Sequence, residues 1–317
     1  MRDRFIIGSR GSDLALWQTN FVKSSLEHLF PEIAFEIKII ATTGDKLLDV
    51  ALSKIGDKGL FTQQIEAELF SGEIDLAVHS LKDLQTSQPD GLTIGAVCER
   101  ELPNDAFISD KFDSISDLPI GARVATGSLR RRSQLLNLRP DIEIVEIRGN
   151  VPTRLRKFAE AGLDAMILAY AGLHRLGLDS QVKQVIPFDE MLPAVGQGTV
   201  AVEVRADNTD AAELASKIDH KPTRVCVAAE RALLRTLEGG CQVPIGANAQ
   251  LENDRLRLSG FVGSLDGKVV FRESDEGSAE DTEQLGVRLA EKLITMGARE
   301  LLDETRARAV ASSESVM

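Results

Sequence analysis

The chain has 317 residues, of which 43% are hydrophobic and 27% charged, and its formal net charge is −12. This length exceeds what one hydrophobic core usually supports, so we expect two or three domains of a globular protein. The acidic charge argues against a nucleic-acid partner, and no apolar run approaches the ~20 residues that span a bilayer.

The first predicted element is a strand, followed by a turn and a helix. Residues 5–8 are largely apolar, the turn SRGS occupies residues 9–12, and an apolar helical stretch follows. The apolar start is too short for a signal peptide, which favours a cytoplasmic location. Residues 43–61 combine three glycines with lysines, and we expect them to form a mobile cover over a cleft.

A second predicted strand covers residues 74–79 and runs into the sequence SLKD at residues 80–83. A neighbouring Lys–Asp pair is usually an ordinary surface pair. At the carboxyl end of a strand, however, Lys82 can hold a ligand carboxylate and Asp83 can stabilise a developing cation. We interpret His79 as a core or capping histidine.

The strand–turn–helix unit recurs at residues 124–136, where a Gly-Ser turn leads into Arg130, Arg131 and Arg132. Cations at a helix N-terminus are disfavoured by the helix dipole. Their accumulation makes sense if an anionic ligand joins them and the free backbone N–H groups. Arg132 is interpreted as a solvated surface charge.

Each copy of this unit is followed by an aspartate and an apolar strand, at Asp75 and at Asp164. Strands that alternate with helices predict parallel sheets with ligands at the carboxyl ends of the strands. We therefore expect two similar α/β lobes, each with an anion-binding turn. The glycines of residues 195–198 predict a hinged crossing into a strand that returns to the first lobe.

The remainder predicts a small α+β domain. The expected elements are a helix over 223–237, strands over 247–251, 256–262 and 269–272 with a hairpin turn at Asp266-Gly267, and one helix over 281–302. We expect the tail from residue 307 to be disordered. The predicted domains are 1–98 plus 199–217, 99–198, and 218–317.

The three cysteines are odd in number and lack paired spacing, which argues against a disulfide framework and a zinc site. Cys98 and Cys226 stand in apolar surroundings and fit core packing. Cys241 follows two glycines after the predicted helix, where a turn can project the thiol for covalent chemistry. Core packing stays open for Cys241 as well. A Cys–His protease dyad has no local pattern in its support.

These features resemble the porphobilinogen deaminase (hydroxymethylbilane synthase) family. The motifs that carry the resemblance are GSRGSDLAL at 8–16, VHSLKD at 78–83, TGSLRR at 126–131, RGNV at 148–151, VGQG at 195–198 and GGC at 239–241. They occur in family order over nearly the whole chain. One departure is Gln85, which stands where the family commonly has proline.

The resemblance implies two periplasmic-binding-protein-like lobes and a third α+β domain. It also implies a transferase of porphyrin, heme and tetrapyrrole biosynthesis. Such an enzyme joins four porphobilinogen molecules head to tail into hydroxymethylbilane and releases ammonia at each addition. The growing chain starts from a dipyrromethane cofactor, which the matching position attaches to Cys241 by a thioether. We further expect a monomer without a metal, a nucleic-acid partner or membrane attachment.

The resemblance also assigns site residues. Asp83 matches the catalytic carboxylate, and Lys82 is expected beside it as the second catalytic residue. The positions matched to cofactor binding are Cys241, Arg10, Ser12, Lys82, Ser128, Arg130, Arg131, Arg148 and Arg154, and those matched to substrate binding are Arg10, Arg148, Arg154 and Arg175. The alternative is a non-catalytic two-lobed binding protein for small polycarboxylates, which requires neither Cys241 nor the Lys82-Asp83 pair.

Overall fold

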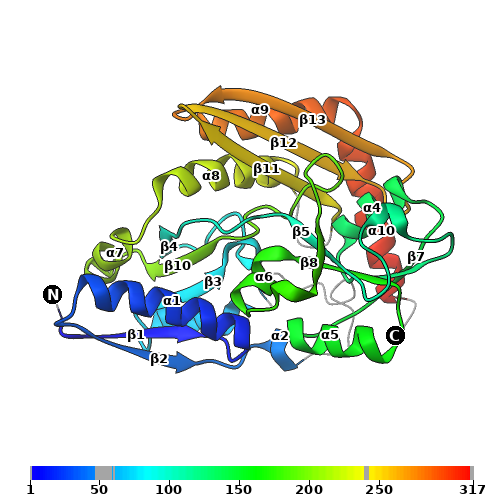
Figure 1. The fold of residues 1–317 in the computed structure, drawn as a ribbon. Coiled ribbons are helices and arrows are strands. Elements are labelled where there is room, and N and C mark those ends of the chain that lie inside the picture. Colours follow the sequence, from blue (N-terminus) through cyan, green and yellow to red (C-terminus); the bar gives the residue numbers. More distant parts are fainter. Residues whose placement is uncertain (1, 47–58, 60, 239–242, 315–317) are drawn as a thin grey trace. The chain divides into compact units, whose positions relative to one another are not determined.

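The computed structural model describes residues 2–46, 59, 61–238 and 243–314. Most of the expected cover, residues 47–58 and 60, and the glycine–cysteine turn at 239–242 lie outside the described residues. The described chain forms two compact units (Figure 1). Unit 1 holds Met1–Leu48, Asp57–Glu101 and Gly198–Arg224, and unit 2 holds Leu102–Gln197 and Val225–Met317.

Unit 1 is built on a five-stranded sheet with the order β2-β1-β3-β10-β4. Its strands are β1 (Arg4–Ser9), β2 (Ala34–Ile39), β3 (Leu76–Ser80), β4 (Leu92–Val97) and β10 (Val200–Arg205), and its helices are α1 (Asp13–Leu29), α2 (Thr43–Lys46), α3 (Gln63–Ser71) and α7 (Thr209–Ser216). Apolar side chains of α1 and α7 pack against one face of the sheet. Ile65 and Leu69 of α3 pack against the other face. Helices on both faces explain why the inner strands β3 and β10 are almost completely buried.

The first sheet of unit 2 has the order β7-β6-β8-β5-β9. Its strands are β5 (Asp105–Ile108), β6 (Arg123–Ala125), β7 (Glu143–Val145), β8 (Ala165–Ala169) and β9 (Val182–Val185), and its helices are α4 (Leu129–Leu138), α5 (Val151–Glu160) and α6 (Tyr170–Arg175). Leu135 of α4 packs on one face. Phe158 of α5 and Leu173 of α6 pack on the other.

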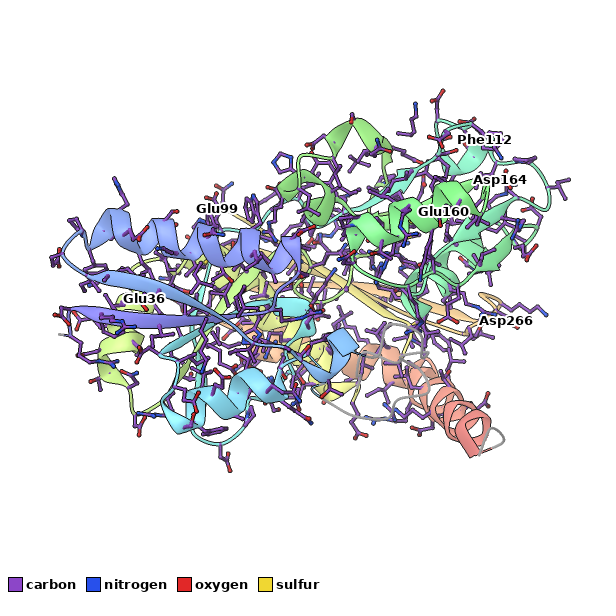
Figure 2. All side chains as sticks on the ribbon, turned by 90° about the horizontal axis from the view of Figure 1, so that it is seen from below. Glu36, Glu99, Phe112, Glu160, Asp164 and Asp266 are labelled. Carbon is purple, nitrogen blue, oxygen red and sulfur yellow. The ribbon has the colours of Figure 1, made fainter. Side chains whose placement is uncertain are left out.

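The two sheets confirm the predicted repeat. β1 and β6 occupy the same place in their sheets, each between two parallel partners. The carboxylate of Asp75 accepts a hydrogen bond from the backbone N–H of Ile6 at 2.9 Å. The carboxylate of Asp164, labelled in Figure 2, accepts one from the N–H of Arg123 at 2.9 Å. The same aspartate therefore ties the third strand to the first strand in both copies.

The predicted parallel pairing is confirmed for β1, β2 and β3 and for β6, β7 and β8, but each sheet also contains antiparallel strands that the sequence analysis did not predict. β10 runs antiparallel to β3 and β4, and β5 runs antiparallel to β8 and β9. Each of these strands enters its sheet directly after the chain passes from one unit to the other. The predicted return of the chain to the first lobe after residues 195–198 is confirmed by β10.

The C-terminal part of unit 2 is an α+β layer, as predicted. It comprises the antiparallel strands β11 (Ile245–Glu252), β12 (Arg255–Gly263) and β13 (Val270–Ser278) with the helices α8 (Lys221–Thr236), α9 (Thr282–Thr295) and α10 (Ala298–Glu314) (Figure 1). The expected single helix over 281–302 is two helices, which break at Gly297 with a φ of 111°. The expected disorder from residue 307 was also wrong up to residue 314, where α10 ends. No helix of the described residues is long and apolar enough to cross a membrane.

Candidate active site

The candidate residues of unit 1 lie at the carboxyl ends of two neighbouring parallel strands. Arg10 and Ser12 follow β1, and the Lys82-Asp83 pair follows β3. Ser12 caps α1, where its side chain accepts from the N–H of Ala15 at 3.4 Å. This edge of a parallel sheet is where ligands bind in α/β folds.

Arg10 lies against an aromatic ring. Its guanidinium carbon is 4.2 Å from the centre of the Phe61 ring, which is the geometry of a cation–π contact. The Arg10 side chain is only half-buried. Its charge is therefore held in place while part of the side chain stays accessible to solvent.

Lys82 and Asp83 belong to a single 3-10 turn, Leu81–Asp83. Leu81 is 1% exposed, and its N–H donates to the carbonyl of Thr199 at 2.9 Å. Lys82 is half-buried and Asp83 is exposed. The turn is therefore anchored by a buried leucine and its backbone hydrogen bond to Thr199, and it presents the carboxylate to solvent.

His79 is a core residue, as predicted. It is 5% exposed, and its Nε2 lies 3.2 Å from Oε2 of Glu203, which is fully buried on β10. The two atoms do not meet in hydrogen-bond geometry. This pair lies within the sheet, so we give His79 no catalytic role.

The corresponding turn of unit 2 holds its arginines differently. Ser128 caps α4 and accepts from the N–H of Arg131 at 3.4 Å. Arg130 and Arg131 are each only 5% exposed, and both donate to the fully buried carboxylate of Asp105. Nη1 of Arg130 is 2.6 Å from Oδ2, and Nε and Nη2 of Arg131 are 3.0 and 2.7 Å from Oδ1.

This buried ion cluster is electrostatically unbalanced. Burial alone would raise the pKa of Asp105, but the charges and hydrogen bonds of Arg130 and Arg131 hold that pKa well below its usual 3.8. Burial also lowers the pKa of Arg130. Two guanidinium groups face one carboxylate, and Nε of Arg130 is buried without a hydrogen-bond partner. The trio therefore suits a further carboxylate from a ligand.

The remaining candidate arginines lie at the same edge of this sheet. Nε of Arg148, after β7, donates to Glu146 at 2.9 Å, and Nε of Arg154, on α5, donates to the carbonyl of Gly149 at 2.7 Å. Arg175 ends α6, which follows β8, and it is 9% exposed. The parallel strands β6, β7 and β8 thus all end in segments that carry cations.

A close backbone approach brings two of these segments together. A Cβ at Gly127 would lie 2.8 Å from the carbonyl oxygen of Ile147, so only glycine lets the turn before α4 pack against the segment after β7. The N–H of Thr126 also donates to the carbonyl of Val145 at 2.9 Å. Ser128 and Arg148 are therefore held on adjoining turns.

The structure groups the candidates into two sets, one in each unit. Cys241 lies outside the described residues. Sequence reasoning missed Asp105 and Gln197, which donates its side-chain amide to Asp105 at 2.8 Å. A charged residue at the start of the apolar strand β5 was the available signal for Asp105. In the described part of the chain, no group of three or more histidine, cysteine or acidic side chains could hold a metal ion.

Comparison with known proteins identifies relatives over nearly the full length. The family model described as "Porphobilinogen deaminase, dipyromethane cofactor binding domain" matches residues 5–213. The one described as "Porphobilinogen deaminase, C-terminal domain" matches residues 224–295. The porphobilinogen deaminase of Carboxydothermus hydrogenoformans is 54% identical over 306 residues, which cover 96% of this chain and 98% of that protein. The Pelotomaculum thermopropionicum enzyme has the same identity and coverage.

Among solved structures, the methionine-binding protein MetQ aligns with 68% of this chain and 89% of its own at 14% sequence identity, with a TM-score of 0.45.

Proposed function

Because this chain belongs to the porphobilinogen deaminase family, we propose how its own residues carry out the reaction of that family. The protein is a transferase of heme and tetrapyrrole biosynthesis that joins four porphobilinogen molecules into hydroxymethylbilane with release of ammonia. It uses a dipyrromethane cofactor, which supplies the pyrrole end from which the chain grows. The non-catalytic binding protein is set aside, because relatives at 54% identity over 96% of the chain are enzymes.

Asp83 is the proposed catalytic carboxylate. Loss of ammonia leaves positive charge on the pyrrole, and an ionised carboxylate beside it lowers the energy of that charge. The observation that carries this role is the position of Asp83 at the carboxyl end of β3, exposed on a turn that Leu81 anchors. Lys82, next to it, is the second proposed catalytic residue and holds a carboxylate of the cofactor or of the growing chain.

The arginines orient the acetate and propionate groups of the pyrroles. The proposed cofactor-binding residues are Arg10, Ser12, Lys82, Ser128, Arg130, Arg131, Arg148 and Arg154, and the proposed substrate-binding residues are Arg10, Arg148, Arg154 and Arg175. Their positions at the carboxyl ends of parallel strands support this role. Two guanidinium groups, of Arg130 and Arg131, face the single carboxylate of Asp105, and Nε of Arg130 is buried without a hydrogen-bond partner. Both observations support the binding of a further carboxylate from a pyrrole chain.

Cys241 is the proposed point of attachment of the cofactor, through a thioether. It follows α8 in the sequence. Of the other two cysteines, Cys98 is 2% exposed and Cys226 is 8% exposed, and both lie in hydrophobic cores. Buried thiols of that kind are poor nucleophiles.

We also propose that the protein is a cytoplasmic monomer with three domains, 1–98 plus 199–217, 99–198 and 218–317. The net charge of −12 supports the absence of a nucleic-acid partner.

Intact mass of the purified protein tests the cofactor and its attachment together. The wild type should carry the mass of one dipyrrole, and brief exposure to limiting porphobilinogen should add covalent species that differ by one pyrrole. C241S should show neither, whereas the matched variants C98S and C226S should retain both. An unmodified wild-type mass at full activity would overturn the covalent attachment.

A further inference from the structure

Residues 192–197, here called the return segment, form the last stretch of unit 2 before the chain re-enters unit 1. The segment contains no helix or strand. Irregular segments are usually exposed and mobile. This one is not: Leu192, Val195 and Gln197 are 1%, 7% and 1% exposed. Its polar atoms are held from two sides.

One side is the arginine cluster. Nη1 of Arg130, which binds Asp105, also donates to the carbonyl of Leu192 at 2.6 Å. The side-chain amide of Gln134 on α4 both donates to Leu192 at 3.0 Å and accepts from it at 2.8 Å. At the other end of the segment, Nε2 of Gln197 donates to Oδ1 of Asp105 at 2.8 Å. The segment is thus bonded at both ends to the proposed carboxylate-binding group.

The other side is the domain that carries Cys241. Glu230 lies on α8 and is fully buried. Its Oε2 accepts from the N–H of Gly196, and its Oε1 accepts from the N–H of Ala249 on β11, both at 2.8 Å. The carbonyl of Pro193 accepts from the N–H of Ala247 at 2.9 Å. One carboxylate therefore joins α8, β11 and the return segment.

We propose that Glu230 and Gln197 are positioning residues that, through the return segment, fix the Arg130–Arg131–Asp105 group relative to α8. α8 precedes Cys241, the proposed attachment residue, in the sequence, so this connection fixes the helix that leads to the attachment residue relative to the carboxylate-binding arginines. The inference rests on the proposed roles of Cys241 and of these arginines. Hydrogen bonds to a buried carboxylate are strong and directional, so they transmit position better than apolar packing does.

The test uses E230Q in the full-length protein. A glutamine keeps the shape, but it sets an N–H against one of the two backbone N–H groups, so one bond is lost. In E230Q, cofactor assembly from apo-protein and porphobilinogen, followed by intact mass, should slow roughly ten-fold or more. The KM for porphobilinogen should rise, while kcat of the loaded fraction stays within about two-fold of wild type, because Asp83 is untouched. Amide exchange at Gly196 should accelerate.

Two further variants test whether the effect of E230Q comes from the lost hydrogen bond, from the lost charge or from general destabilisation. E230D keeps the charge but is too short to reach both N–H groups, so it should behave like E230Q. E66Q changes a buried glutamate of α3 in unit 1 that is 7% exposed, and it should leave cofactor assembly unchanged. Wild-type assembly in E230D, or slowed assembly in E66Q, would overturn the proposal.

A double variant tests the connection itself. Q197M removes the amide that binds Asp105 at nearly the same volume. If both residues act through one segment, the double variant Q197M/E230Q should assemble cofactor scarcely more slowly than the slower single variant. Independent effects would instead multiply, and that result would overturn the coupling. Either result leaves the proposed function intact, because that depends on the dipyrrole mass of wild type and C241S.

Discussion

The two lobes present the same turn in two different ways. In unit 1 the turn after β1 carries Arg10, half-buried against Phe61, and the neighbouring turn after β3 exposes Asp83. In unit 2 the turn after β6 carries Arg130 and Arg131, which are buried and already bound to an internal carboxylate. A repeated scaffold thus supports an accessible group in one lobe and a fixed group in the other.

This difference indicates that the buried arginines of unit 2 position the ligand, whereas the exposed carboxylate of unit 1 takes part in the chemistry. A cation fixed by a buried anion loses no side-chain freedom when a ligand arrives, so it contributes orientation at low entropic cost. A carboxylate that must face each new pyrrole in turn has to remain accessible. The exposed Asp83 meets that requirement, and the buried Asp105 does not.

The largest expected effect separates the two carboxylates by rate. D83N should fold and retain the cofactor, but its kcat should fall by roughly a thousand-fold, which is about 4 kcal/mol of barrier, because an amide cannot offset the developing positive charge. Steady-state kinetics measure this kcat, and intact mass checks that D83N carries as much cofactor as the wild type. A loss below ten-fold would remove Asp83 from the central role.

The next expected effect distinguishes Asp105 from Asp83 by their contributions to the free energy of unfolding. D105N leaves two buried guanidinium groups without their anion and should lower the free energy of unfolding by about 3 kcal/mol, whereas D83N should change it little. The folded-state pKa of Asp105 is depressed, so its contribution is present above the usual 3.8 and is lost as the pH falls below that value. Urea unfolding of both variants at neutral pH and near pH 3 gives the comparison. Equal stability of D105N and wild type at neutral pH would contradict it.

The smallest effect tests the symmetry of the lobes. D75N and D164N each replace a carboxylate oxygen that accepts a strand N–H, so each should cost about 1 kcal/mol of stability with little change in kcat. A hydrogen bond from Arg123, then one from Lys111, lowers the pKa of Asp164. Urea unfolding should therefore show the D164N difference at neutral pH and a smaller one in acid. Strongly unequal costs at neutral pH would show that the two aspartates are not equivalent.

Much of the site could be predicted from the sequence, because its residues lie at fixed offsets from local signals. The caps Ser12 and Ser128, the strand before Lys82-Asp83 and the α8 helix all follow from short-range patterns of glycine, serine and apolar spacing. The repeat was visible for the same reason, since Asp75 and Asp164 each precede an apolar strand. The break between α9 and α10 at Gly297 could not be predicted in this way, because the amphipathic periodicity continues across that glycine.

The sequence by itself determined the α/β class, the repeat, the family and the positions of the candidate residues, since all of these rest on local composition and motif order. Only the tertiary structure decided that Arg130 and Arg131 share Asp105, which lies 25 and 26 residues away in sequence. It also decided that Glu230 binds Gly196, and that β5 and β10 run antiparallel to their neighbours. The physical reason is that burial and pairing between distant segments depend on which strands become neighbours, and no local pattern specifies that choice.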